Sequence, residues 1–280
     1  MTRVPVNGIE LNVEAAGEGR PLLLLHGFTG DVSSWSFLAG LEGMRRIAVD
    51  LIGHGNSDSP AAPERYSMAD AIRDLEAVLD ACDVDRATVV GYSMGGRLAL
   101  HFALDAPHRV EALILESASA GVEDLRERDA RVEADNALAD RIEREGIEAF
   151  VDYWQSIPLF ASQLRLPVEV FEAQRHRRLS QSPAGMANSL RGMGAGRQSY
   201  LMARLGEIEA PTLLIAGALD ERYAGLARTM SSQIRGSRVE IVPDAGHAAH
   251  LERPEIFIEV VQRFLSEHVT RDNRQRMTSG

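Results

Sequence analysis

The segment Gly91–Gly95, which reads Gly-Tyr-Ser-Met-Gly, constrains this chain more than any other part of its sequence. It lies between an apolar run at 87–90, which predicts a buried strand, and a helical pattern at 96–104. The glycines allow a sharp strand-to-helix turn that holds the hydroxyl of Ser93 clear of the sheet. The same turn directs the backbone N–H of Met94, at the start of the helix, toward negative charge that develops beside the serine.

A serine becomes basic or nucleophilic when a histidine accepts its proton, and an acid must fix the tautomer of that histidine. Asp220 and His247 each follow an apolar run that predicts a strand, and they occur in the order serine, acid, histidine. We therefore predict a triad of Ser93, His247 and Asp220. Glu116, at the end of another predicted strand, is an alternative acid.

A second loop supplies the other expected donor to an oxyanion. His26-Gly27-Phe28-Thr29-Gly30 follows the apolar run Leu22–Leu25, and its glycines allow a close approach to the serine turn. We expect the backbone N–H of Phe28 to form an oxyanion hole with that of Met94. His26 is expected to shape the loop through hydrogen bonds to the backbone, and His54 is assigned no role.

Short apolar runs alternate with amphipathic stretches, which is typical of a mainly parallel sheet flanked by helices, an α/β fold. Ser67 and Asp70 predict a capped helix, and Pro254 opens another. From 121 to 200 helix-forming residues replace the strand pattern. We predict an α/β core at 1–120 and 201–270, a helical cap at 121–200 and a flexible tail at 271–280. The predicted strands are Ile9–Val13, Leu22–Leu25, Ile47–Asp50, Ala87–Gly91, Ala112–Glu116, Thr212–Ala216 and Val239–Val242.

Composition removes several classes of function. All 30 basic residues of the 280-residue chain are arginine, which excludes Schiff-base lysine chemistry and the lysine of a P-loop. A formal net charge of −11 argues against a nucleic-acid partner. The single cysteine, Cys82, falls on an apolar helix stripe and fits a reducing compartment. Met1–Gly8 lacks the apolar core of a secretion signal, and the apolar run Leu22–Leu25 is too short to span a membrane, so we expect a cytoplasmic protein. We also expect a monomer or a weak homo-oligomer.

Two rival motifs fail on context. The spacing Gly192-x-Gly194-x-Gly196 does not follow a strand in a βαβ unit, so it does not predict a dinucleotide site. His247 and His250 lack the glutamate of a zinc-protease helix. No metal and no cofactor are implied.

The cap carries an unusual excess of positive charge. Six arginines lie between 165 and 197, against Glu169 and Glu172. Because the guanidinium group binds carboxylates in a bidentate manner, this island predicts a substrate that carries several carboxylates. The alternative is a solvated helix surface whose arginines pair with nearby acids. Arg97 is a further candidate, since it lies one helical turn after Ser93 and on the same side. The six cap arginines are Arg165, Arg175, Arg177, Arg178, Arg191 and Arg197.

The chain as a whole resembles proteins of the α/β-hydrolase fold, and more narrowly the MenH family of menaquinone biosynthesis, the 2-succinyl-6-hydroxy-2,4-cyclohexadiene-1-carboxylate (SHCHC) synthases. The resemblance runs from about Asn7 to Leu265. The narrower match rests on Gly91–Leu100, Leu115–Gly121, Glu127-Arg128 with Arg131 and Asp135, Trp154 with Pro158-Leu159-Phe160, and Ser189–Gly194 with Gly196.

This resemblance implies a lyase that uses no cofactor and eliminates pyruvate from 2-succinyl-5-enolpyruvyl-6-hydroxy-3-cyclohexene-1-carboxylate, a tricarboxylate. It implies that Ser93, acting with His247 and Asp220, is the general base. The N–H groups of Phe28 and Met94 would hold the enolate oxygen. A serine hydrolase of a carboxylate-bearing ester or of a carbon–carbon bond is the alternative, and a non-catalytic binding protein is a third possibility.

The resemblance also implies substrate contacts beside the serine and in the cap. Arg128 and Arg131 lie one helical turn apart, as do Arg175 and Arg178. The resemblance does not decide which arginine of each pair contacts the substrate. After the acid the chain has Arg222-Tyr223, where the family usually has lysine and phenylalanine. The implied contacts are Tyr92, Arg97, Arg131, Trp154 and Arg175.

Overall fold

The computed structural model describes the backbone of residues 2–278 and the side chains of residues 2–267. Its described strands form one eight-stranded sheet in the order β1-β2-β4-β3-β5-β6-β7-β8. Strands β3 to β8 pair in parallel with their neighbours, whereas β1 and β2 are antiparallel at one edge. The strands are β1 (Thr2–Val6), β2 (Ile9–Ala16), β3 (Arg20–Leu25), β4 (Met44–Val49), β5 (Ala87–Tyr92), β6 (Val110–Glu116), β7 (Thr212–Gly217) and β8 (Arg238–Val242).

All seven predicted strands are confirmed, and one further strand, β1, was missed. Only two of its five residues, Val4 and Val6, are buried, so its sequence carries a weak apolar signal. The turn that joins β1 to β2 did carry a signal. Asn7 and Gly8 both have positive φ, at 44° and 85°, as a two-residue hairpin turn requires.

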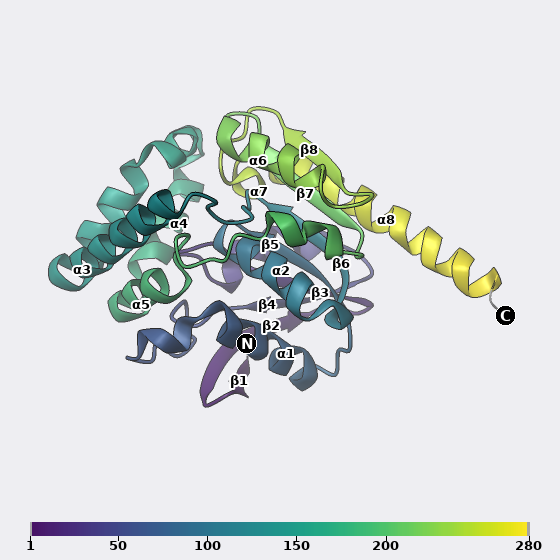
Figure 1. Cartoon of the computed structure of the whole chain (residues 1–280), viewed down its shortest axis with the longest axis horizontal. Coiled ribbons are helices and arrows are strands. Elements are labelled where there is room, and N and C mark those ends of the chain that lie inside the picture. The colour runs from purple at the N-terminus through teal and green to yellow at the C-terminus, as the bar shows by residue number, and fades with distance from the viewer. Residues whose placement is uncertain (1, 279–280) are drawn as a thin grey trace.

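Helices cover both faces of the sheet (Figure 1). They are α1 (Met68–Ala81), α2 (Met94–Asp105), α3 (Leu125–Ser156), α4 (Val168–Leu179), α5 (Pro183–Met193), α6 (Glu221–Ser231), α7 (Ala249–Glu252) and α8 (Pro254–Thr278), with short 3-10 helices η1 (Val32–Gly40), η2 (Pro63–Tyr66), η3 (Pro107–Arg109), η4 (Pro158–Arg165) and η5 (Met202–Glu207). Ser67 caps α1 by accepting the Asp70 N–H, as predicted. None of the helices in the described part of the chain has the length and apolar character needed to cross a membrane.

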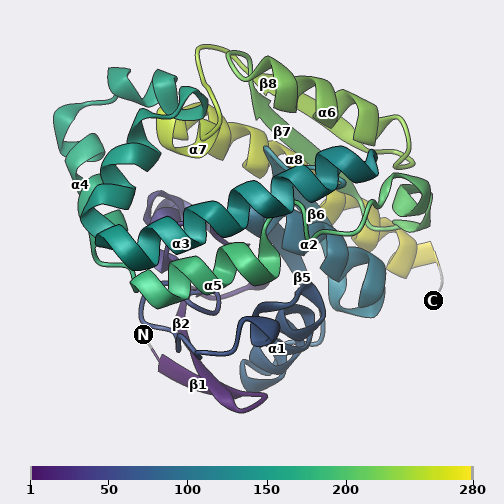
Figure 2. The same ribbon diagram turned by 60° about the vertical axis from the view of Figure 1, so that its left-hand side comes forward.

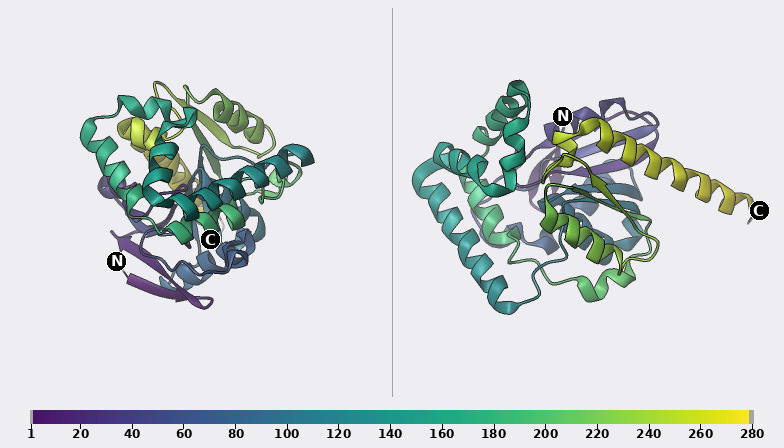
Figure 3. Two further views of the ribbon diagram at one scale, coloured as in Figure 1. Left: turned by 90° about the vertical axis from the view of Figure 1, so that its left-hand side faces the viewer. Right: turned by 90° about the horizontal axis from the view of Figure 1, so that it is seen from above.

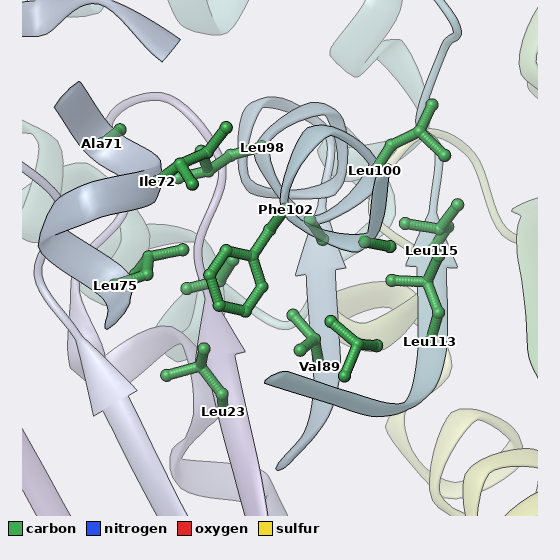
Figure 4. Packing of buried hydrophobic residues seen from close by; sticks show 14 of the residues in the cluster. Leu23, Ala71, Ile72, Leu75, Val89, Leu98, Leu100, Phe102, Leu113 and Leu115 are labelled. Carbon is green, nitrogen blue, oxygen red and sulfur yellow. The ribbon is translucent and has the colours of Figure 1, made fainter. Parts of the chain in front are cut away.

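Alternate residues of the strands supply two separate cores, because successive side chains point to opposite faces. Leu23, Val89 and Leu113 pack with α1 and α2 on one face (Figure 4). Leu24, Val90 and Ile114 pack with η1 and α8 on the other face. The sheet is therefore buried on both sides, as a parallel sheet requires.

The segment predicted as a cap holds α3, η4, α4 and α5, which lie together over one end of the sheet (Figures 2 and 3). These helices have a small core of their own that includes Ile142, Phe150 and Met186. Gly146 breaks α3 with a φ of 83°, so the helix bends there. Of the predicted tail 271–280, the backbone to Thr278 belongs to α8, whereas residues 279–280 and the side chains of the whole tail lie outside the described part of the structure.

Candidate active site

Ser93 occupies a strained turn between β5 and α2. Its φ of 50° and ψ of −105° lie outside the regions that L-residues favour, at a cost on the order of 1–3 kcal/mol. Gly91 and Gly95 make the turn possible, because a Cβ on Gly91 would clash with the Gly95 carbonyl, and a Cβ on Gly95 with that of Leu25. The Ser93 N–H donates to the carbonyl oxygen of Glu116 at 2.8 Å, which ties the turn to β6.

The three predicted triad residues meet at the carboxyl edge of the sheet. His247 Nε2 lies 3.0 Å from Ser93 Oγ, and His247 Nδ1 lies 2.7 Å from Asp220 Oδ2. The His247 and Asp220 side chains are 2 % and 8 % exposed, so bulk water does not compete for these hydrogen bonds. Because Asp220 accepts the Nδ1–H, Nε2 is left free to accept the serine proton.

Glu116, the alternative acid, does not contact His247. Its carboxylate binds His250 instead, at 2.8 Å from Nδ1. The two histidines of the His-x-x-His motif therefore pair with different carboxylates. Within the described residues, no group of three or more His, Cys, Asp or Glu side chains gathers as a metal site.

The predicted oxyanion donors both line the cavity at Ser93. Met94 is the first residue of α2, so its N–H has no acceptor within the helix. Phe28 lies in the facing loop, where His26 holds the backbone as predicted: its Nε2 accepts the Leu51 N–H at 3.0 Å, and its Nδ1 lies 2.8 Å from the Gly27 carbonyl. Burial lowers the pKa of His26, which keeps its ring neutral.

Two adjoining cavities lie between the core and the cap. The smaller, of about 100 Å³, contains the triad and is lined by four of the five predicted substrate contacts, Tyr92, Arg97, Arg131 and Trp154. The larger, of about 390 Å³, lies between the 27–37 segment and α4. Phe28, Tyr92 and Phe160 line both cavities and form the boundary between them.

The smaller cavity contains an arginine that has no acidic partner among the described residues. Arg97 is partly buried and donates from Nη1 to the Met193 carbonyl at 2.9 Å, but forms no salt bridge with a carboxylate of the described residues. Burial lowers the pKa of its guanidinium to about 10. The indole N–H of Trp154 is buried, and none of the residues that the structure describes accepts a hydrogen bond from it. Arg131 differs, since it is 46 % exposed and pairs with Asp135 at 2.8 Å.

Arg175, the fifth predicted substrate contact, does not line either cavity. This side chain turns away from both cavities and binds Asp152 at 2.6 Å and Gln155 at 2.9 Å. Arg178, one turn along α4, lines the larger cavity instead. It is 4 % exposed, its guanidinium carbon lies 5.2 Å from the Phe160 ring centroid, and its Nη1 has no hydrogen-bond partner within the described structure. Burial lowers its pKa to about 10.

Two site features were missed in the sequence. Tyr223 lines the smaller cavity, and its ring centroid lies 4.5 Å from that of His247. Its position three residues after Asp220, in the first turn of α6, was the available signal. Glu252 binds the loop that carries His247, and no local pattern pointed to it.

Comparison with known proteins agrees with this geometry. Residues 20–254 match the profile of a family described as the alpha/beta hydrolase fold. A Bacillus subtilis (strain 168) protein provisionally named 2-succinyl-6-hydroxy-2,4-cyclohexadiene-1-carboxylate synthase is 44 % identical over 90 % of this chain and 93 % of its own. The solved structure of MenH from S. aureus is 34 % identical, has a TM-score of 0.86, and is matched over 96 % of this chain and 99 % of its own. A malate-bound esterase from Thermogutta terrifontis has a TM-score of 0.85 at 29 % identity, with the same coverage of each chain.

Proposed function

The chain belongs to the α/β-hydrolase family and, within it, to the SHCHC synthases, and from this membership we propose that it eliminates pyruvate from 2-succinyl-5-enolpyruvyl-6-hydroxy-3-cyclohexene-1-carboxylate. The observation that carries the proposal is a complete triad together with two cavity-lining arginines, Arg97 and Arg178, that pair with no carboxylate of residues 2–267. Neither a simple apolar ester nor a neutral ligand would need them.

In the proposed mechanism Ser93 is a base and not a nucleophile. Its hydroxyl proton moves to His247 Nε2 as Oγ removes the proton from the ring carbon next to the succinyl ketone. Asp220 stabilises the imidazolium that forms. The ketone oxygen becomes an enolate oxygen and is held by the N–H groups of Phe28 and Met94.

Collapse of this enolate completes the reaction. The electron pair on C2 forms a double bond to C3, the ring double bond moves from C3–C4 to C4–C5, and the carbon–oxygen bond from C5 to the enolpyruvyl group breaks. The leaving enolpyruvate takes the proton from His247, becomes pyruvate, and returns the triad to its starting state. No covalent bond to Ser93 forms at any stage.

The division of the site into two cavities fits a large polyanion. A cavity of about 100 Å³ is too small for the whole substrate, so the molecule must extend past Phe28, Tyr92 and Phe160 into the larger cavity. A desolvated guanidinium without a counterion is costly, and a bound carboxylate removes that cost. Arg97 and Arg178 therefore serve two separate carboxylates, and Arg131 lies at the smaller cavity for a third.

A serine hydrolase is the second candidate, and one observation favours it. The same triad and oxyanion donors would support an acyl-enzyme, and the Thermogutta esterase has a closely similar fold. The two functions differ in the fate of Ser93. A hydrolase turns over activated esters rapidly and accumulates an acyl group on Ser93, whereas the lyase does neither.

Location and partners form part of the same proposal. A single cysteine fits a reducing compartment, so we place the chain in the cytoplasm. The acidic net charge of −11 fits a small-molecule substrate without a nucleic-acid partner, and we expect a monomer or a weak homo-oligomer.

The test supplies the enolpyruvyl substrate and follows pyruvate with a coupled assay. Wild-type protein should release pyruvate, and Ser93→Ala should reduce the rate to background while its thermal unfolding stays close to that of wild type. Absence of pyruvate with folded wild-type protein would overturn the proposal.

A further inference from the structure

Glu116 joins the serine turn to the segment that follows His247. It is the last residue of β6, and its side chain is fully buried. Its backbone carbonyl accepts the Ser93 N–H at 2.8 Å. Its carboxylate accepts two hydrogen bonds from His250, at 2.9 Å from the backbone N and 2.8 Å from Nδ1. A single buried residue thus holds both sides of the Ser93–His247 contact.

Aromatic rings confine the His250 side chain. Its ring centroid lies 4.7 Å from that of Tyr92, 5.3 Å from that of Trp35 and 5.8 Å from that of Phe37. These rings leave the imidazole little freedom to rotate. Because the ring cannot move freely, the hydrogen bond from Nδ1 to Glu116 holds the start of α7 in place and does not restrain the side chain alone.

Glu252 holds the same loop from the other side. This residue, at the end of α7, is also buried. Its Oε2 lies 2.8 Å from the backbone N of Gly246, and its Oε1 lies 3.4 Å from that of Ala248. Its carboxylate thus accepts hydrogen bonds from the residues immediately before and after His247.

Neither glutamate contacts Asp220, and neither forms a salt bridge with an arginine of the described residues. Burying two carboxylates costs desolvation free energy, which their hydrogen bonds must offset. What they share is the backbone of the loop 246–250, whose course sets the distance between the imidazole and the serine. Proton transfer is sensitive to that distance, because a displacement of about 1 Å can reduce a rate on the order of 100-fold.

We propose that Glu116, His250 and Glu252 form a positioning clamp that holds His247 Nε2 within hydrogen-bond reach of Ser93. These are positioning residues, since none of them is a member of the triad. The inference rests on the proposed function only in requiring that His247 activate Ser93, and it holds equally for a lyase and a hydrolase.

The test uses a chemical probe that does not depend on the natural substrate. A fluorophosphonate forms a phosphorus–oxygen bond to an activated serine and expels fluoride, while the histidine takes the serine proton. The rate at which it labels Ser93 in the full chain therefore reports the Ser93–His247 contact. Ser93→Ala should prevent labelling.

The variants distinguish a positioning role from a general loss of stability. Glu116→Ala should reduce the labelling rate roughly 30- to 100-fold. Glu116→Gln should keep the rate within about 3-fold. Its amide oxygen can accept the backbone N–H of His250, and its amide NH₂ can donate to Nδ1 when the imidazole is in its other neutral tautomer. Glu252→Ala tests the second carboxylate, and it keeps the proposal falsifiable if Glu116→Ala does not fold.

Asp74 offers a matched control. It is 2 % exposed in α1, binds Arg65 at 2.7 Å and Asn7 at 2.9 Å, and does not line either cavity. Asp74→Ala should lower the unfolding temperature and leave the labelling rate unchanged. If Glu116→Ala and Glu252→Ala behave in the same way as this control, the clamp is structural only and the proposal is wrong.

The pyruvate assay keeps this proposal separate from the proposed function. Slower labelling in the clamp variants together with no pyruvate from wild type would support the clamp and reject the lyase. The proposed lyase also predicts a lower kcat with KM nearly unchanged in Glu116→Ala. A wild-type protein that the probe does not label would contradict activation of Ser93, and with it the clamp.

Discussion

Two groups of arginines in this lysine-free chain differ in what surrounds them. Arg175 and Arg191 lie on the outside of the cap and bind acids, Arg175 with Asp152 and Arg191 with Asp140 and Glu143. Arg97 and Arg178 line the cavities, and neither forms a salt bridge with an acid in the described part of the chain. The same residue type thus forms ion pairs in one place and lines a cavity without an acidic partner in another.

The comparison shows why local charge does not identify a binding site by itself. The cap arginines form one positive island in the sequence, yet Arg175, Arg177 and Arg191 are neutralised by nearby carboxylates. The cavity-facing arginines that have no carboxylate partner among the described residues carry a desolvation cost that an anionic substrate would remove. Their function should therefore be sensitive to mutation while their removal should do little harm to the fold.

Arg97→Met is expected to have the largest effect. Loss of one charge-assisted hydrogen bond is worth about 1.5–3 kcal/mol, so kcat/KM should fall roughly 10- to 150-fold, toward the upper end because Arg97 shares the smaller cavity with Ser93. The unfolding temperature should not fall, since an unpaired charge is replaced by an apolar chain of similar length. A kcat/KM close to wild type would show that Arg97 serves only to bind the Met193 carbonyl.

Arg178→Met should reduce kcat/KM about 10-fold, mainly through KM, because the larger cavity is separated from the triad by Phe28, Tyr92 and Phe160. Steady-state kinetics and thermal unfolding of the same preparation measure both effects. A variant that loses stability without any change in KM would indicate that Arg178 is present for its contact with Phe160.

Arg131→Ala should have a smaller effect, about 3- to 10-fold in kcat/KM. Its side chain is 46 % exposed and already paired with Asp135, so a substrate carboxylate must compete with water and with that acid. Raising the salt concentration should weaken binding to wild type more than binding to the variant. An equal salt dependence would contradict a direct ionic contact.

Arg175→Ala and Arg191→Ala should leave kcat/KM within about 2-fold of wild type and change the free energy of unfolding by no more than about 1 kcal/mol. Both ion pairs are at the surface, where solvent and salt screen them. These variants are the matched controls for Arg97 and Arg178. A large loss of activity in either one would remove the distinction between the two groups of arginines.

The meeting of Ser93, His247 and Asp220 could be predicted from the sequence because short segments define it. The serine turn needs a strand, two glycines and a helix in immediate succession, and Asp220 and His247 follow their own strands. Parallel strands bring these ends to one edge, so local patterns were sufficient.

The cap arginines and the clamp could not be predicted in the same way. The face of α4 that meets the core depends on packing against α3, which bends at Gly146, and this decides between Arg175 and Arg178. Glu116 and His250 are 134 residues apart, and no spacing rule joins them. Strand β1 was missed for a local reason, since only two of its five residues, Val4 and Val6, are buried.

The most direct test of the central claim is a single-turnover reaction of excess protein with the enolpyruvyl substrate, quenched and analysed by mass spectrometry. If Ser93 is a general base, one pyruvate should form for each SHCHC, and the mass of the protein should be unchanged at every time point. A transient increase in protein mass localised to Ser93 would contradict it. Consumption of the substrate without formation of SHCHC and pyruvate would also contradict it.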